Sequence, residues 1–515
     1  MCVHCLVLGG CVSINRLNRN IESAVADKAA GLGSIATNTL VDAFRPSSRP
    51  LAETKLLVLD LSTTLRLAEL YSRSLQSQRE HLYTSGLSTL AQRRKFGIQY
   101  SGTLSYVLNN AKNTASSSSG SLNLGASKVL PTGGTVTTSA GSIQRGTGSF
   151  KGTEGSTVYD NSASVELRQP LLAGAGYSVS HESVIQSERN LIYSLRSFVQ
   201  VRQDFAIKTM SSYFNLLSAK RVVDNTKLSV EQSIFLRKRS EALFKVSLGT
   251  ALDVMRARQG ELAASNEVWA VEAGYESQVR RFLIELGLSS DTPVVVEGTI
   301  PDVSPVNTTN TAIFIKLGLE RRLDLASKRD QVEDAKRKLA IARNNLLLNV
   351  DLYGKAGVSS VSADTPTGGD FEESSAVGIS VKLPLDRRDE RDELKLAMIT
   401  VADTQRNLDE YIDILKVEIE ENLRNLATQE NNVLIQKEAT KIAERKYEYS
   451  LLQFKAGEIP NRDVVEAQNE LLNAKNAHVN ALVAYELLRL KLLRNVGLLD
   501  VDNEGRLIEM QGEQK

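Results

Sequence analysis

The feature that most constrains this chain is an internal repeat with a spacing of 210 residues. Shifting the sequence by that amount aligns residues 215–288 with residues 425–498 without a gap. An ungapped match over about seventy residues is not expected by chance, so the chain contains two copies of one structural unit. The matched pairs include Phe244/Phe454, Asp253/Asp463, Ala257/Ala467, Leu262/Leu472, Tyr275/Tyr485 and Gly287/Gly497.

Long tracts without proline indicate that each copy contains unusually long helices. Only ten prolines occur in 515 residues, with none between Pro170 and Pro293 and none after Pro460. Proline breaks helix interiors because it lacks an amide donor and clashes with the preceding turn. We therefore expect long helical hairpins over residues 177–288 and 386–498.

Apolar residues on these hairpins recur with coiled-coil spacing, which packs helices side by side. A shorter helix is expected before each hairpin, one beginning near Ser62, whose hydroxyl can cap it, and one over residues 312–346. A plain coiled-coil rod would explain the stripes but neither the strands nor the repeat. The stripes are Leu408, Ile412, Leu415, Ile419, Leu426 and Val433 in the second half and Ile207, Met210, Phe214 and Leu217 in the first.

Between the shorter helix and the hairpin of each copy, the apolar period changes to two. This period predicts β segments over residues 96–170 and 347–385, with loops rich in Gly, Ser and Thr. The alternation suits strands with lipid on one face and water on the other. A soluble antiparallel sheet gives the same pattern. No later run of 18 apolar residues exists, so a membrane crossing would have to be a barrel.

The number of strands bears on how such a barrel could close. The pattern predicts two strands of membrane length in each half, hence four in the chain. Four strands cannot close a barrel, because known membrane barrels begin at about eight. Several copies must then share one barrel. The segment 96–170 is longer than a hairpin needs, so an extra β layer or a large external loop is expected there.

The ends of the chain differ from the repeats in composition. Residues 1–11 are expected to be the stub of an export signal, because Gly9 and Gly10 before Cys11 resemble a lipoprotein cleavage site. Cys11 is then the predicted lipidation site, although an ordinary short apolar start would look similar. The expected divisions are a polar leader at 12–58, a first repeat at 59–288, a linker at 289–311, a second repeat at 312–498 and a tail at 499–515.

Several classes of function are disfavoured by composition. The net charge of +1 offers no electrostatic footprint for nucleic acid. All three cysteines lie in the first eleven residues, and the four histidines have no ligand spacing, so no metal site is expected. No nucleophile motif or phosphate loop occurs. We expect no enzyme activity and no cofactor.

Local motifs resemble those of the TolC-like outer-membrane efflux and secretion proteins over roughly residues 58–499. Gln169-Pro170-Leu171-Leu172 resembles the strand-to-helix turn of that family, and Arg321-Arg322-Leu323-Asp324-Leu325 resembles the start of its second half. The two hairpin turns resemble its helical tips. Departures are Leu323, where the family usually has proline, and Ser247, where glycine is expected.

The resemblance implies a mainly α fold with a membrane β-barrel. Three copies would build a 12-stranded barrel in the outer membrane, continuous with a 12-helix tunnel in the periplasm. The implied function is passive export, driven by an inner-membrane pump through a periplasmic adaptor, in a tripartite efflux pump or a type I secretion system. A rival interpretation is a periplasmic coiled-coil adaptor or scaffold, although adaptors normally have one hairpin.

The helical tips are the expected sites of contact and gating. The adaptor is expected to contact Ser247, Leu248, Gly249 and Thr250 in the first tip and Ala456, Gly457, Glu458, Ile459 and Pro460 in the second. Asp463 and Glu466 lie one helical turn apart, and acidic rings in a trimer select cations. These two and Asp253 are the expected gate residues. An Asp near a helix start also caps free amides, which is the simpler interpretation of Asp253 and Asp463.

Overall fold

The computed structural model describes residues 56–109, 117–147, 157–247, 249–303, 310–363, 365–366, 369–502 and 505–509. Cys11 and Leu248 lie outside the described residues. The chain divides into two compact units. Among the described residues, the first unit holds 82–194 and 327–408, and the second holds the rest.

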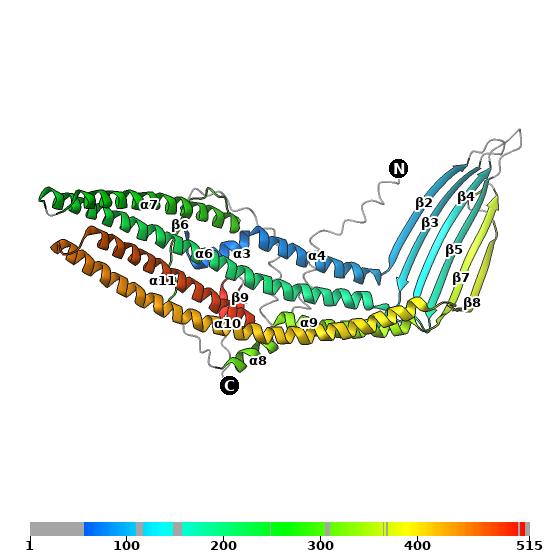
Figure 1. Ribbon diagram of the computed structural model, residues 1–515. Coiled ribbons are helices and arrows are strands. Elements are labelled where there is room, and N and C mark those ends of the chain that lie inside the picture. Colours follow the sequence, from blue (N-terminus) through cyan, green and yellow to red (C-terminus); the bar gives the residue numbers. More distant parts are fainter. Residues whose placement is uncertain are drawn as a thin grey trace. The chain divides into compact units, whose positions relative to one another are not determined.

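The helices repeat in length as well as in sequence (Figure 1). The paired helices are α3 (Leu61–Tyr71) with α8 (Thr311–Arg321), α4 (Arg73–Lys95) with α9 (Leu323–Asn345), α6 (Glu182–Lys245) with α10 (Arg388–Ala456), and α7 (Ala251–Glu285) with α11 (Asn461–Val496). A short α5 (Tyr177–Ser180) precedes α6. None of the helices in the described part of the chain combines the length and apolar character needed to cross a membrane.

Each of the two shorter helices expected from the sequence is broken into a segment of 11 residues and a segment of 23 residues. Ser72 between α3 and α4, and Arg322 between α8 and α9, have extended backbone conformations. The prediction of one continuous helix over 312–346 was wrong because the Arg322 side chain forms polar contacts that hold this break. The N-cap of α3 is also Asp60 rather than Ser62, since a carboxylate oxygen of Asp60 accepts from the Thr63 amide at 2.8 Å.

A glycine after each hairpin makes an equivalent contact in both repeats. Gly287, with φ +82°, follows α7, and a Cβ there would lie 2.0 Å from the carbonyl oxygen of Tyr71. Gly497, with φ +74°, follows α11, and a Cβ there would lie 2.8 Å from Cβ of Arg321. Tyr71 and Arg321 each end the first short helix of their repeat. Only glycine combines a left-handed backbone with so close an approach.

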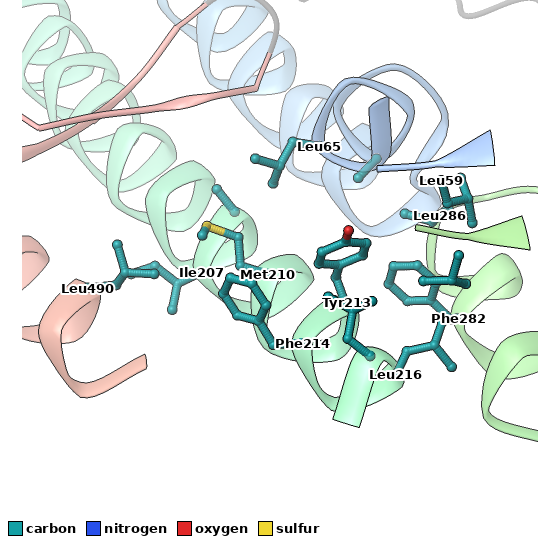
Figure 2. Close-up of a cluster of buried hydrophobic side chains, with 14 of the residues drawn as sticks. Leu59, Leu65, Ile207, Met210, Tyr213, Phe214, Leu216, Phe282, Leu286 and Leu490 are labelled. Carbon is teal, nitrogen blue, oxygen red and sulfur yellow. The ribbon is translucent and has the colours of Figure 1, made fainter. Parts of the chain in front are cut away.

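The main core of the second unit gathers around α6 (Figure 2). Tyr213 and Phe214 are each 1% exposed and pack with Met210, Leu59 and Leu286. The Tyr213 hydroxyl donates to the carbonyl oxygen of Glu297 at 2.6 Å. Large aromatic rings of this kind bury the most apolar area per residue, and the hydroxyl keeps its hydrogen bond.

Parts of the expected leader, linker and tail belong to this second unit. The strand β1 (Leu57–Leu59) pairs in parallel with β6 (Val294–Val296), which lies inside the expected linker. The strand β9 (Leu499–Val501) pairs with β10 (Leu507–Glu509), and both Leu499 and Val501 are core residues. These segments therefore fasten the core rather than only joining the repeats.

Eight of the ten predicted stripe residues are buried, and Leu408 and Ile412 are half-buried, which agrees with helices packed side by side. In α10, Ile419 and Leu426 are 0% exposed, and Leu415 and Val433 are also buried. In α6, the four predicted stripe residues are all buried, Ile207, Met210, Phe214 and Leu217. Burying a side chain of this size stabilises the fold by about 1.5–3 kcal/mol relative to exposure.

Among its described residues, the first unit contains one antiparallel sheet of six strands in the order β2-β3-β4-β5-β7-β8 (Figure 1). The estimate of four strands was wrong, because the Gly- and Ser-rich segment of the first repeat supplies four strands by itself. A 12-stranded barrel from three copies would need four strands from each. The strands are β2 (Gln99–Asn109), β3 (Ser117–Val129), β4 (Thr135–Thr147), β5 (Thr157–Pro170), β7 (Asn349–Ala363) and β8 (Phe371–Lys382).

Candidate functional site

The six-stranded sheet has one apolar face and one polar face. Opposed residues in neighbouring strands point to the same side. One such row runs across five strands through Gly102, Leu124, Ala140, Ala163 and Val358. We call its side the apolar sheet face. It also carries Tyr100, Leu104, Tyr106, Leu122, Val136, Val165, Leu167, Leu352, Val377, Ile379 and Val381.

The opposite side, the polar sheet face, holds most of the charge. One of its rows runs through Thr103, Asn123, Gly141, Ser162 and Ser359. Eight of the ten charged residues in the six strands lie on this face, and the other two, Lys128 and Glu373, lie on the apolar one. Facing strands pair some of these charges, as in Arg145 with Asp160 at 3.9 Å and Arg168 with Asp351 at 3.4 Å.

The described part of the chain leaves the apolar sheet face uncovered. Tyr100 is 80% exposed, Leu104 is 81% exposed and Val377 is 84% exposed. A contiguous apolar surface of this kind is rare on soluble monomers and marks contact with a membrane or another protein. The sheet therefore has the two-sided character that the alternating sequence predicted for strands between lipid and water.

In the second unit, α7, α6, α11 and α10 lie side by side in that order (Figure 1). Lys227 of α6 pairs with Glu272 of α7 at 2.7 Å. Gln468 of α11 donates to Ser229 of α6 at 2.7 Å from Nε2 to Oγ. Lys446 of α10 pairs with Glu470 of α11, and Thr440 of α10 donates to the Ala474 carbonyl oxygen at 3.1 Å. The outer members of this row are α7 and α10.

Both outer helices carry an exposed apolar stripe with a spacing of seven residues. The α7 stripe is Met255, Leu262 and Trp269, and the α10 stripe is Ile435, Ile442 and Tyr449. All six side chains are between 61% and 76% exposed. Sequence reasoning missed both stripes because it followed the buried heptad row, although the spacing of seven is readable in the sequence. Such stripes are the seams of coiled coils.

The first helical tip is built around a positive backbone angle. Ser247 has φ +60°, the one non-glycine residue with positive φ in the described chain. Its repeat equivalent is Gly457, with φ +81°, so the glycine expected at this tip reflects a real conformational demand. Gly249 and Thr250 follow, and Thr250 is the N-cap of α7.

Asp253 completes a capping box with Thr250. The Asp253 amide donates to the Thr250 hydroxyl oxygen at 3.2 Å, and the Thr250 amide donates to a carboxylate oxygen of Asp253 at 3.2 Å. The Thr250 hydroxyl also donates to that carboxylate at 2.6 Å. This reciprocal arrangement satisfies two free amides at the helix start. Its contacts make Asp253 a helix cap.

The second tip differs from the first in how its helix begins. Ala456, Gly457, Glu458 and Pro460 are exposed, and Ile459 packs against a small core of Leu236, Phe454 and Val464. Pro460 is the N-cap of α11 and has no capping side chain. Asp463 is half-buried in the first turn of α11, within 4.0 Å of Arg462, and Glu466 is exposed one turn later.

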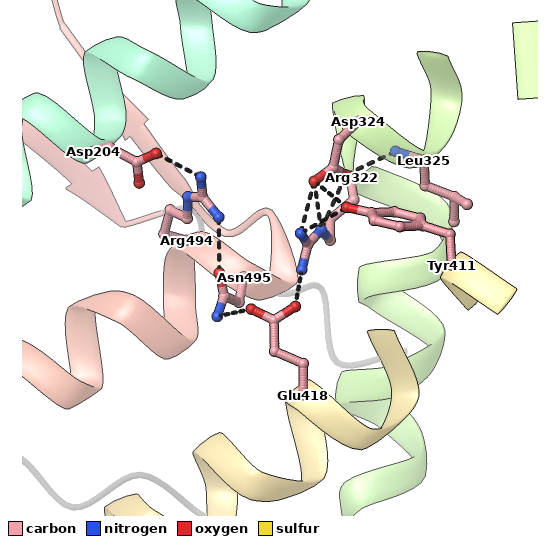
Figure 3. A network of polar contacts seen from close by, with 8 residues as sticks. All are labelled: Asp204, Arg322, Asp324, Leu325, Tyr411, Glu418, Arg494 and Asn495. Carbon is pink, nitrogen blue, oxygen red and sulfur yellow. Dashed lines mark hydrogen bonds and ion pairs between the residues drawn. The ribbon is translucent and has the colours of Figure 1, made fainter. Parts of the chain in front are cut away.

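A network of polar side chains connects the break between α8 and α9 to the helix α10 (Figure 3). Arg322 donates to Asp324 at 2.7 Å and to Glu418 at 2.9 Å, and the Tyr411 hydroxyl donates to Asp324 at 2.7 Å. Burial alone would raise the pKa of Asp324, but hydrogen bonds from Arg322 and Tyr411 lower it to about 2. Burial and the hydrogen bond to Asp324 raise the pKa of Tyr411 to about 12. Asp324 therefore stays charged and Tyr411 protonated near neutral pH.

The network continues from Glu418 to α11. Asn495 donates to Glu418 at 2.9 Å, Arg494 donates to Asn495 at 3.0 Å, and Arg494 also donates to Asp204 of α6 at 2.6 Å. The sequence pointed to Arg321–Leu325 only by resemblance and did not predict these partners, which are up to 290 residues apart. The first repeat has a counterpart in Glu69, which accepts from Arg79 at 2.9 Å and Arg202 at 2.8 Å.

Comparison with known proteins agrees with this architecture. Residues 314–497 match the family model described as outer membrane efflux protein. Over the second repeat, the chain is therefore similar to the outer membrane efflux protein family. The match spans α8 to α11, including the sheet strands β7 and β8 and the second tip. The comparison with curated proteins finds no match for the sequence.

Solved structures extend the likeness to both repeats of the chain. The outer-membrane channel OprN is 14% identical, with a TM-score of 0.63 over 85% of this chain and 89% of that one. The Campylobacter jejuni CmeC outer membrane channel is 15% identical, with a TM-score of 0.62 over 88% and 87%. The outer membrane protein VceC from Vibrio cholerae is 14% identical, with a TM-score of 0.64 over 85% and 96%. The expected TolC-like fold, mainly helical with a sheet, is confirmed.

Proposed function

We propose that this chain is the outer-membrane channel of a tripartite efflux pump or a type I secretion system. It conducts substrates passively from the periplasm to the exterior and carries out no chemistry. The observation that carries the proposal is the six-stranded sheet, uncovered on its apolar face and charged on the other, in a chain with the fold of outer-membrane channels. Lipid covers the apolar sheet face, and the polar sheet face lines the passage.

Open edges in both units support assembly from several copies. Among the described residues, β2 pairs with β3 alone and β8 with β7 alone, which leaves two free edges. An open edge in lipid costs several kcal/mol per unsatisfied backbone group, on the order of the transfer cost of an amide. The exposed stripes of α7 and α10 leave the helical row open in the same way. Three copies close both, with four long helices each and twelve in the tunnel.

The helical tips are the proposed docking surface for the partners. The first tip presents Ser247, Gly249 and Thr250, and the second presents Ala456 to Pro460, mostly exposed in one chain. Small and polar residues on helix turns suit end-on contact with a periplasmic adaptor. That adaptor joins the channel to an inner-membrane pump. Neighbouring copies cover the exposed stripes of α7 and α10, so neither the adaptor nor the pump needs to contact these stripes.

The gate is proposed to use Glu466, with Asp463 beside it. Glu466 is exposed on α11 near the second tip, so three copies would place three carboxylates around one opening. Rings of this kind attract cations and repel anions. Asp253 has a smaller part in the proposal, because its carboxylate is engaged with Thr250 in the capping box.

Replacing Glu466 with glutamine should reduce cation selectivity without changing the assembly. Three negative charges leave the opening, while size and shape stay nearly the same. Single channels in planar bilayers should show a cation-to-anion permeability ratio lower by roughly severalfold at low salt, where screening is weakest. The control is Glu267→Gln, an exposed glutamate on α7 away from both tips. Equal selectivity in Glu466→Gln and the parent channel would rule out this gate.

A further inference from the structure

The two repeats differ in length only where the first repeat forms extra strands. The helices before the sheet correspond at a shift of 250 residues, as Leu61 to Thr311 and Arg73 to Leu323 show. The hairpins after it correspond at a shift of 210 residues. The first repeat therefore holds 250 − 210 = 40 additional residues between α4 and α6.

Most of those additional residues form the hairpin β3–β4. The first strand of each β segment starts at equivalent positions, Gln99 in β2 and Asn349 in β7, which differ by 250. The second repeat returns at once through β8, whereas the first inserts β3 and β4 before its return strand β5. We call the segment Ser117–Thr147 the inserted hairpin.

The inserted hairpin is part of the sheet along its whole length. Strand β3 pairs with β2 from Gln99–Ser127 to Asn109–Ser117, and β4 pairs with β5 from Thr135–Arg168 to Gly146–Thr157. A hairpin lying across the opening would leave β2 and β5 paired with each other. Here the hairpin separates β2 from β5 and pairs with both of them, as strands within a barrel do.

The inserted hairpin also keeps the two-sided pattern of the sheet. Leu122 and Leu124 of β3 and Ala140 of β4 lie on the apolar sheet face, whereas Asn123 and Ser139 lie on the polar one. Each strand has 13 residues. About 9–11 residues suffice for a tilted strand to cross a membrane.

The turn of the inserted hairpin is hydrogen-bonded to the short helix α5, which precedes the long helix α6. The Gly176 amide donates to the Thr132 carbonyl oxygen at 3.0 Å, and the Ser180 hydroxyl donates to the Pro131 carbonyl oxygen at 3.1 Å. A Cβ at Gly133 would lie 2.5 Å from the Gly174 carbonyl oxygen. The turn thus sits at the same end of the sheet as the connections to the helices.

We propose that β3 and β4 are membrane-spanning wall strands, so that the channel has an eighteen-stranded barrel with a widened outlet. The count is three copies of six strands and rests on the proposed three-copy channel. Strands 4.8 Å apart and tilted near 40° each occupy about 6 Å of circumference, which gives a backbone diameter of about 36 Å. Twelve such strands would give about 24 Å. The outlet therefore suits bulkier solutes than a twelve-stranded one.

Cysteine accessibility in the full-length protein, in native outer membrane, tests this placement. Each variant is treated with a charged, membrane-impermeant maleimide, and the labelling of the parent chain is subtracted because it has three cysteines of its own. Strand β8, which has no part in the inserted hairpin, provides the matched pair. The variants are Asn123→Cys, Ser139→Cys and Ala376→Cys on the polar sheet face, and Leu124→Cys, Ala140→Cys and Val377→Cys on the apolar one.

If β3 and β4 are barrel strands, the polar-face cysteines of the inserted hairpin should react severalfold more than its apolar-face cysteines, as in β8. Detergent that strips the lipid should remove the difference. Equal reaction at both faces of β3 and β4, with alternation kept in β8, would overturn the inserted wall strands and leave the channel proposal standing. Loss of alternation in β8 as well would overturn both.

Discussion

Replacing Leu262 with arginine is expected to convert the assembled channel into single chains. Leu262 is the central residue of the exposed α7 stripe and is 65% exposed in one chain. Within a chain the change is cheap, because the new side chain can stay in water. In the assembly it would place three unpaired charges in three apolar seams, each with a penalty of several kcal/mol. Native mass measurement in detergent should show a monomer.

The stripe of α10, which would contact α7 of the neighbouring copy, should be equally sensitive to a charge. Ile442→Arg on the α10 stripe should also give single chains, since Ile442 is 61% exposed and central in its stripe. The matched control is Leu228→Arg on α6, a leucine 54% exposed that belongs to neither stripe. It should stay assembled. Intact assemblies of Leu262→Arg and Ile442→Arg would show that α7 and α10 do not form the contact between neighbouring copies.

Gly287→Ala should be the most destabilising small substitution in the helical part of the chain. The residue has φ +82°, which disfavours any side chain, and the added Cβ would lie 2.0 Å from the Tyr71 carbonyl oxygen. Backbone strain alone costs about 1–3 kcal/mol, and the collision adds to it because a carbonyl cannot move aside as a side chain can. Thermal unfolding of the detergent-solubilised protein should begin several degrees lower.

Gly260→Ala in α7 is the matched control for that substitution. Nothing lies within 4 Å of a Cβ at Gly260, and the residue is helical. Alanine should stabilise the helix there by about 1 kcal/mol relative to glycine. Unchanged unfolding of Gly287→Ala beside a stabilised Gly260→Ala would mean that the joint between α7 and Tyr71 contributes little to the fold.

The order of hairpins and strands in this fold could be predicted because it follows from the spacing of repeated and apolar residues in the sequence. The shift of 210 residues located both hairpins, and the row containing Ile419 and Leu426 is buried as expected. Two-residue alternation likewise gave the strands that carry large apolar residues, such as β2 and β8. These signals arise from periodic burial, which is a local property of sequence.

Other elements depend on contacts that no local pattern encodes. The break at Arg322 reflects partners on α10, including Glu418. Strands β3 and β4 consist mainly of Ser, Gly, Thr and Asn, so only a few residues such as Leu122 and Leu124 carry the alternation. Asp253 was expected either as a gate residue or as a helix cap, and its hydrogen bonds with Thr250 show the cap.

The size and location of the unmodified protein test the central claim most directly. Cells are separated into soluble periplasm and outer membrane, and the detergent-extracted chain is weighed by native mass measurement. The proposal expects recovery only from the outer membrane, with the mass of three chains. A single chain recovered from soluble periplasm without detergent would contradict the channel and favour a periplasmic scaffold.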